Sequence, residues 1–253
     1  MRGDETRTPV GSQPLVPPDA GVPDAGVPDA SAPDASAPDG RAPDGWAIDG
    51  RAIGTRGAAT RRKLLDATAD LLRDNGVRDL RVVDIARTVG TSPATYYQYF
   101  RDVEDAVLVL AEEIGTNEVV PIAAVFDEIW SGDEGLANAR ALVEAFFELW
   151  DRHHAVLRTR NLAAQEGDTR FREIRNRANR PFVEGFAQQV RSHQATKAVA
   201  DAISPVGAAA ALIALIERMA GFHNELRGLG VDRTEVIETT ARICFQTVVG
   251  TNS

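Results

Sequence analysis

The stretch LRVVDIARTVGTSPATYYQYFRD, residues 80–102, determines the fold that we expect for this chain. Apolar residues recur at helical spacing in its first half, and Gly90 is expected to stop that short helix. Ser92 followed by Pro93 is typical of a helix start, with serine as the N-cap and proline in the first helical position. This second helix is expected to run to about Phe100. The two helices predict a helix-turn-helix, whose second helix can enter the major groove of DNA.

All three tyrosines of the chain lie in this second helix. Tyr96 and Phe100 are four residues apart and are expected to face the core, whereas Tyr97 falls on the opposite side and Tyr99 on the flank. An exposed phenol ring can pack on a sugar or a thymine methyl group while its hydroxyl reaches a phosphate oxygen. The same exposed front is expected to carry Ala94, Thr95 and Gln98.

Helical patterns flank this motif on both sides. An apolar stripe begins after Thr60, and Asn75-Gly76 is expected to provide its left-handed C-terminal stop. Asp102, with Asp105 three residues later, is expected to begin a longer connecting helix. The stripe consists of Leu64, Leu65, Ala67, Thr68, Leu71 and Leu72.

Charge is divided unevenly along the chain. The formal net charge is −9, but the segment from Arg56 to Arg101 carries nine cationic and five anionic side chains, a local charge of +4. The rest of the chain therefore carries −13. A small cationic module joined to an acidic body indicates a polyanionic partner for the module.

Residues 17–55 form a degenerate five-residue repeat rich in aspartate and proline. Regularly spaced proline removes backbone donors, and the intervening alanines and valines are too small to build a core. We therefore expect residues 1–55 to be a disordered arm, which either screens the basic module, binds a partner or is a dispensable extension. The other predicted domains are a helix-turn-helix domain at 56–101 and a helical effector-binding and dimerisation domain at 102–253.

The helical pattern continues beyond the motif, and no stretch alternates with period two for long enough to be a strand. The predicted fold class is therefore all-α. Pro181 lies inside one expected helix and should kink or divide it. The body helices are expected near residues 119–130, 134–152, 154–165, 169–195, 205–226 and 232–249.

The stretch ATRRKLLDATADLLRDNGVRDLRVVDIARTVGTSPATYYQYFRDVEDAVLVL resembles the DNA-binding domain of the TetR (tetracycline repressor) family. The resemblance covers about residues 56–110. It implies a homodimer that binds double-stranded DNA at a palindromic operator, and it implies DNA contacts from the second helix of the motif and from nearby arginines. The candidate DNA-binding residues are Arg61, Arg62, Arg81, Ser92, Pro93, Ala94, Thr95, Tyr97, Gln98 and Tyr99.

Two positions depart from the family pattern. Arg81 stands where family members commonly have a threonine or serine that caps the second helix, and Val103 stands where many have a lysine. Arg81 loses the cap but can itself reach a phosphate. Together with Arg101 and the run from Arg61 to Lys63, it is a candidate to replace the missing lysine contact.

The C-terminal two-thirds is similar to the branch of this family that includes the ethionamide regulator EthR. The similarity rests on ALVEAFFELWDRHHAVLRT (residues 141–159) and IALIERMAGFHNELRGLG (residues 213–230). It implies that this domain forms the dimer and encloses a pocket for a small, apolar effector. Core packing needs the same residue types, so both roles stay open for each candidate. The candidate ligand-binding residues are Leu142, Phe146, Trp150, Asn179, Phe182, Phe186, Ile213, Ile216 and Ala220.

The last two expected helices are apolar on more than one side. In a monomer this leaves an exposed patch, which usually marks an interface. Two helices from each subunit would form an isologous contact with two-fold symmetry. Such symmetry suits DNA binding, because paired modules must reach half-sites about 34–36 Å apart, or a multiple of that distance.

Other functions fit the sequence less well. Glu148 and His153 are five residues apart rather than the three or four that place ligands on one helical face, so neither a metal site nor a metal-dependent enzyme is expected around Glu144 and His154. No phosphate-binding loop or nucleophile motif occurs, so we expect no enzyme and no cofactor. A DNA-binding dimer without an effector is the remaining alternative.

The compartment is expected to be the cytoplasm. Cys244 is the single cysteine, which suits a buried thiol in a reducing interior. The longest apolar run, residues 206–216, is too short to span a membrane. The N-terminal region lacks the apolar segment of a secretory signal, so no membrane contact is expected.

Overall fold

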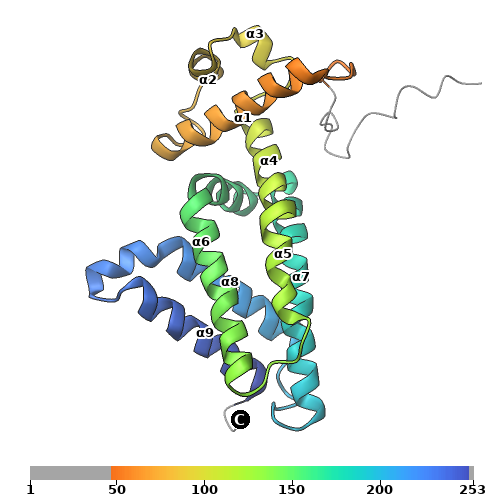
Figure 1. The fold of residues 1–253 in the computed structure, drawn as a ribbon, viewed down its shortest axis with the longest axis vertical. Coiled ribbons are helices and arrows are strands. Elements are labelled where there is room, and N and C mark those ends of the chain that lie inside the picture. Colours follow the sequence, from red (N-terminus) through yellow and green to blue (C-terminus); the bar gives the residue numbers. More distant parts are fainter. Residues whose placement is uncertain (1–46, 251–253) are drawn as a thin grey trace, which may run out of the picture. The chain divides into compact units, whose positions relative to one another are not determined.

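The computed structural model describes residues 47–250, and these residues contain helices and no strand (Figure 1). The predicted all-α class is confirmed, with an N-terminal helix-turn-helix followed by a helical domain. The first three helices, here called the reading head, are α1 (Thr55–Asp74), α2 (Val82–Val89) and α3 (Pro93–Tyr96). The body comprises α4 (Val103–Ile114), α5 (Val120–Ile122), α6 (Gly132–Gln165), α7 (Thr169–Ala195), α8 (Pro205–Leu226) and α9 (Arg233–Val249).

Helix α1 buries the predicted apolar stripe, of which Leu71 alone is only partly buried. The predicted left-handed stop is wrong, because Asn75 has an extended backbone with φ −125° and Gly76 does not adopt a positive φ. The backbone N–H of Asn75 and its side-chain amide both donate to the carbonyl of Leu71, at 3.2 and 2.9 Å. These two bonds satisfy a terminal carbonyl without a left-handed residue.

Helix α3 is shorter than predicted, ending at Tyr96 instead of near Phe100. The N–H of Gln98 bonds to the carbonyl of Thr95 at 3.3 Å, and that of Tyr99 to Tyr96 at 2.9 Å. These i to i+3 bonds form a tighter coil than an α-helix and lead the chain into α4. Asp102 begins α4 as predicted, since its Oδ1 accepts the N–H of Asp105 at 2.7 Å.

The helix predicted near 119–130 is wrong as a separate element. A π-helical turn at Gly115–Val119 instead extends α4 into α5. A 3₁₀ turn at Ala123–Phe126 then ends this continuous helical segment. Gly115 keeps helical angles, so nothing at that position breaks the helix between Ile114 and Val119.

Two further body predictions need correction. The helices expected at 134–152 and 154–165 are one helix, α6, with a kink at His153, whose φ is −121° and ψ 19°. Pro181 lies inside α7 but does not divide it. Ile174 and Ala178 pack on the core before the proline, and Phe182 and Phe186 pack on it afterwards, so the helix is held on both sides of the lost hydrogen bond.

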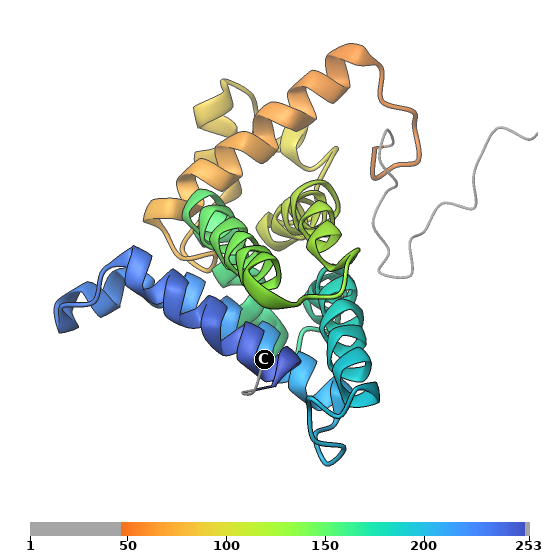
Figure 2. The same ribbon diagram turned by 60° about the horizontal axis from the view of Figure 1, so that its bottom comes forward.

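The body core centres on α6, which packs against α7, α8 and α9 (Figure 2). An aromatic cluster fills it: the ring centroids of Phe146 and Phe182 lie 4.9 Å apart, those of Phe126 and Phe186 4.8 Å, and those of Trp130 and Phe186 5.8 Å. Edge-to-face geometry at these separations is favourable for aromatic pairs. Cys244 is also buried, as predicted.

The predicted disordered arm lies mostly outside the described residues. Residues 47–54 are described and form a turn against the reading head: the N–H of Ala47 bonds to the carbonyl of Arg51 at 2.8 Å, and that of Ile48 to the carbonyl of Gln98 at 3.0 Å. Ala47 is buried. This short segment therefore departs from the predicted disorder, because it has both hydrogen-bond partners and a packing surface.

The helical segment that contains the apolar run 206–216 is longer than the run itself. The segment Pro205–Leu229 is long and apolar enough to span a membrane by length and composition. In this fold, however, α8 packs on α6, α7 and α9. Only 28% of its most apolar window is buried, so much of the helix presents apolar surface outside the chain's own core.

Candidate nucleic-acid interface

The turn between α2 and α3 sets the angle of the second helix. Gly90 is left-handed, with φ 73° and ψ 34°, and the next N–H, that of Thr91, bonds back to the carbonyl of Ala86 at 2.9 Å. Ala86 is fully buried. A glycine adopts these angles without the steric cost of a Cβ, so the chain can reverse directly after α2.

Ser92 caps α3 from the front of the motif. Its Oγ accepts the N–H of Thr95 at 3.2 Å and lies 3.1 Å from the Thr95 hydroxyl. The cap satisfies a free backbone donor at the helix start. It also holds two hydroxyl groups together beside Pro93 and Ala94, which are both exposed.

The tyrosines divide as the spacing predicted. Tyr96 is fully buried and donates its hydroxyl to the carbonyl of Asp102 at 3.1 Å, and its burial raises the pKa of the phenol. Its ring packs 5.3 Å from that of Phe100. Tyr97 is 53% exposed, and Tyr99 is half-buried against the head core. One ring therefore anchors α3 while its neighbour remains available to a partner.

Tyr97 lies at an open hollow of about 550 Å³ between the reading head and the start of α4. The hollow is also lined by Arg81, Val83 and Pro93. The side chain of Gln98 is exposed beside it along the chain. The exposed part of α3 thus combines hydroxyl, amide and ring surfaces, the groups that contact sugars, phosphates and base edges.

The candidate cations are held in different ways. Arg81 precedes α2 without capping it, and its Nε pairs with Asp84 at 2.9 Å. Arg87 pairs with the same carboxylate at 3.1 Å, so two exposed guanidinium groups share one negative charge. Arg61 lies over the ring of Phe100 at 5.4 Å. Arg62 instead faces the body, pairing with Asp66 at 2.9 Å and Glu113 at 2.6 Å.

The sequence-predicted DNA residues therefore fall into two groups. Those from Ser92 to Tyr99, together with Arg81, lie on or beside α3, whereas Arg62 is engaged with α4. The sequence did not single out Arg87, which lies beside Arg81 and pairs with the same carboxylate, that of Asp84. Its signal was the position of Asp84, three residues from each arginine, because this spacing places all three side chains on one helical face.

Of the candidate ligand residues, Asn179 and Ile213 line an open groove of about 570 Å³ between α7 and α8. Arg175 and Glu217 also line it. The other seven candidates are buried in the body core. Among residues 47–250, no three histidine, cysteine or acidic side chains lie close enough to hold a metal ion.

Two family descriptions match the chain. Residues 64–107 match "Bacterial regulatory proteins, tetR family", and residues 122–253 match "Tetracyclin repressor-like, C-terminal domain". The chain belongs to the TetR family. It is a DNA-binding transcriptional regulator of that family. The two helices of the helix-turn-helix, α2 and α3, lie inside the first matched range.

Solved structures share this fold. The fatty acid degradation regulator FadR from Bacillus halodurans is 16% identical with a TM-score of 0.55, and covers 76% of this chain and 96% of its own. FadR from Bacillus subtilis, in complex with stearoyl-CoA, is 14% identical with a TM-score of 0.56, and covers 75% and 98%. A TetR/AcrR regulator from Thermobifida fusca is 21% identical with a TM-score of 0.56, and covers 77% and 100%. Comparison with curated protein sequences gave no match.

Proposed function

We propose that this TetR-family protein is a homodimeric repressor that binds a palindromic operator and leaves it when a small molecule binds the body. The observation that carries the proposal is the capped, exposed front of α3, with Tyr97 outside and Tyr96 locked beneath it. We further propose DNA contacts from Arg61, Arg81, Ser92, Pro93, Ala94, Thr95, Tyr97, Gln98 and Tyr99. Because the proposed binding partner is genomic DNA, we propose that the protein acts in the cytoplasm.

Homodimer formation is supported by the outer face of α8. Val206 is 56% exposed, and the small residue Ala211 is exposed further along the helix, whereas Ala210 and Ala214 line the neighbouring groove between α7 and α8. Ile243 adds apolar surface on α9. Small residues let two helices approach closely, and an apolar face of this length favours a symmetric contact with a second copy.

An effector site in the body is supported by the groove between α7 and α8. Val183 and Ile213 supply apolar wall, and Asn179 supplies a polar group. Grooves with this mixture of apolar surface and few polar groups suit small molecules. The related fold of the stearoyl-CoA complex is consistent with such a role for the body. Membership of the EthR-like branch and the boundary between domains at residues 101 and 102 remain predictions. The alternative is a DNA-binding dimer without an effector.

The proposal is tested by measuring binding to DNA upstream of the protein's own gene by fluorescence anisotropy. The logarithm of the association constant should fall linearly with the logarithm of salt concentration, because phosphate neutralisation releases counterions. No binding in dilute salt, either to this DNA or to duplexes selected from a random pool, would refute the DNA-binding claim. Binding that no body ligand from a screened library releases would favour the effector-free alternative.

A further inference from the structure

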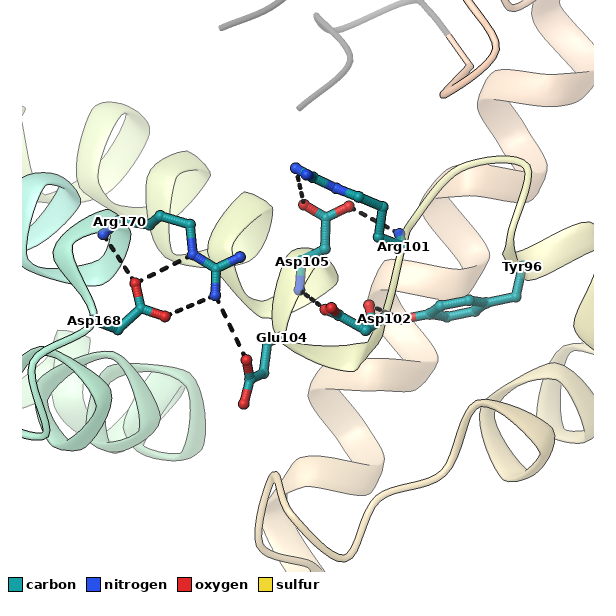
Figure 3. Close-up of polar contacts among 7 residues, drawn as sticks. All are labelled: Tyr96, Arg101, Asp102, Glu104, Asp105, Asp168 and Arg170. Carbon is teal, nitrogen blue, oxygen red and sulfur yellow. Dashed lines mark hydrogen bonds and ion pairs between the residues drawn. The ribbon is translucent and has the colours of Figure 1, made fainter. Parts of the chain in front are cut away.

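The first turn of α4 connects the reading head to the body (Figure 3). On the head side, the carbonyl of Asp102 accepts the Tyr96 hydroxyl, and the Asp105 carboxylate accepts the backbone N–H of Arg101 at 3.0 Å. On the body side, Glu104 points toward Arg170. The turn is therefore fixed to α3, and any tilt of the turn moves the head with it.

Arg170 is held in place by the start of its own helix. Its Nη2 and Nε donate to the two oxygens of Asp168, at 2.7 and 3.2 Å, while Asp168 also caps α7 through the Arg170 N–H. This hydrogen bonding lowers the pKa of Asp168, so the carboxylate stays charged. A guanidinium bound by two hydrogen bonds has a fixed direction, and its Nη2 lies 3.6 Å from Glu104 Oε2.

A second ion pair joins the head to the body nearby. Arg78, in the loop between α1 and α2, places its Nη2 2.7 Å from Oε2 of Glu166 at the C-terminal end of α6. The two ion pairs, Arg170–Glu104 and Arg78–Glu166, are here called the junction clamp. The Arg78–Glu166 pair connects the head directly to the α6 end of the α6–α7 turn, and the Arg170–Glu104 pair connects the α7 end to the first turn of α4, which is fixed to α3.

The space between head and body at the junction clamp is hollow. A cavity of about 220 Å³ is lined by Val77 from the head, Glu104 from α4, and Leu162, Glu166 and Phe171 from the body. Leu162 remains 50% exposed there. Close apolar packing does not fill this hollow, so the ion pairs at its rim add to the restraint that the packing of α1 on α4 and α6 places on the head.

We propose that Arg170 and Arg78 are positioning residues for operator reading: they fix the angle of the reading head on the body and so restrict the half-site spacing that the dimer accepts. The inference rests on the proposed function, since it assumes a dimer that reads two half-sites. It assigns no DNA contact to either arginine. Loss of the junction clamp should broaden spacing tolerance more than it weakens binding to the preferred site.

The test uses the full chain and a duplex that the wild-type protein selects from random DNA. The readout is the spacing penalty, defined as the ratio of dissociation constants for a duplex with one base pair inserted between half-sites and for the selected duplex. Arg170→Gln should lower this penalty about twofold to fivefold, the range expected for losing a solvent-accessible ion pair. Arg172→Gln is the matched control, because it removes the same charge from the same helix and Arg172 makes no ion pair with a described residue. The spacing penalty of this control variant should equal that of the wild type.

A charge exchange gives an independent readout. Arg78→Glu should lower the spacing penalty, and the double variant Arg78→Glu with Glu166→Arg should restore it, because the ion pair is rebuilt with reversed sign. Both variants should keep the wild-type circular dichroism spectrum. An unchanged penalty in Arg170→Gln, or a double variant that stays as tolerant as the single one, would overturn the inference. A wild-type protein that selects no duplex would instead refute the proposed function.

Discussion

Adjacent tyrosines in α3 have opposite roles because their burial differs. The hydroxyl of Tyr96 already has a partner in the carbonyl of Asp102, whereas Tyr97 presents its ring to solvent at the head hollow. A phenol that packs with its neighbours contributes to stability. A phenol that is half exposed on a helix expected to enter a groove contributes to recognition. Substitutions at the two positions should therefore separate stability from DNA binding.

Tyr97→Phe should weaken operator binding by about twofold to tenfold, the effect of losing one net hydrogen bond worth about 0.5–1.5 kcal/mol. Its melting temperature should stay near that of the wild type, because no described residue bonds the Tyr97 hydroxyl. Tyr96→Phe is the comparison and should lower the melting temperature, since it removes the bond to Asp102. Anisotropy and thermal melting check both. Equal loss of binding and stability in Tyr97→Phe would show that Tyr97 is a core residue.

The sequence predicted the burial of individual residues in the head well but not the pairing of its cations. Helical spacing alone separates Tyr96 and Phe100 from Tyr97, because positions four apart share a face. The engagement of Arg62 with Glu113 joins residues 51 positions apart. No local pattern contains that contact, so it becomes visible only when α1 packs on α4.

The helix-turn-helix depends on one left-handed residue between its helices. Gly90→Ala should destabilise the protein by about 1–2 kcal/mol, because φ at this position is 73° and a Cβ is disfavoured there. Gly228→Ala is the matched control, because Gly228 also lies just after a helix, does not have a positive φ, and has nothing within 4 Å of the added Cβ. Urea unfolding measures both. A Gly90→Ala protein as stable as the control would contradict the role assigned to the turn.

Helices α6 and α8 are joined by a buried ion pair. Arg160 is 2% exposed, its Nη2 lies 3.0 Å from Glu217 Oε1, and burial lowers the pKa of its guanidinium. Glu217→Gln should cost about 3–5 kcal/mol, because it leaves a buried cation uncompensated. Glu184→Gln, which breaks the exposed pair with Arg180, should leave the free energy of unfolding close to that of the wild type. Similar unfolding free energies for the two variants would contradict this difference.

Element boundaries were predicted where a local signal decides them. Ser92 and Asp102 begin helices because their own side chains accept backbone donors. The kink at His153 falls between the two helices expected on either side, but the chain passes through it without a break. Pro181 shows the opposite limit. This residue usually breaks a helix, but α7 continues through it because buried residues hold the helix on both sides, Ile174 and Ala178 before it and Phe182 and Phe186 after it.

The chain combines a cationic head with an acidic body, and its α8 carries apolar surface that its own core leaves uncovered. A symmetric dimer would cover that surface and hold two heads at a fixed separation. The sequence predicted the fold class and the reading helix for this assembly. It could not predict which buried residues border a groove, because eight of the nine ligand candidates pack in the core and only one of these eight, Ile213, also lines the described groove.

The central claim is that paired copies of α3 read one duplex. The most direct measurement is the mass of the complex between the full-length protein and its selected palindromic duplex, by light scattering after size-exclusion chromatography. The account predicts two chains on one duplex at moderate salt, with the complex lost as salt rises. A single chain on the duplex, or no complex in dilute salt, would contradict it.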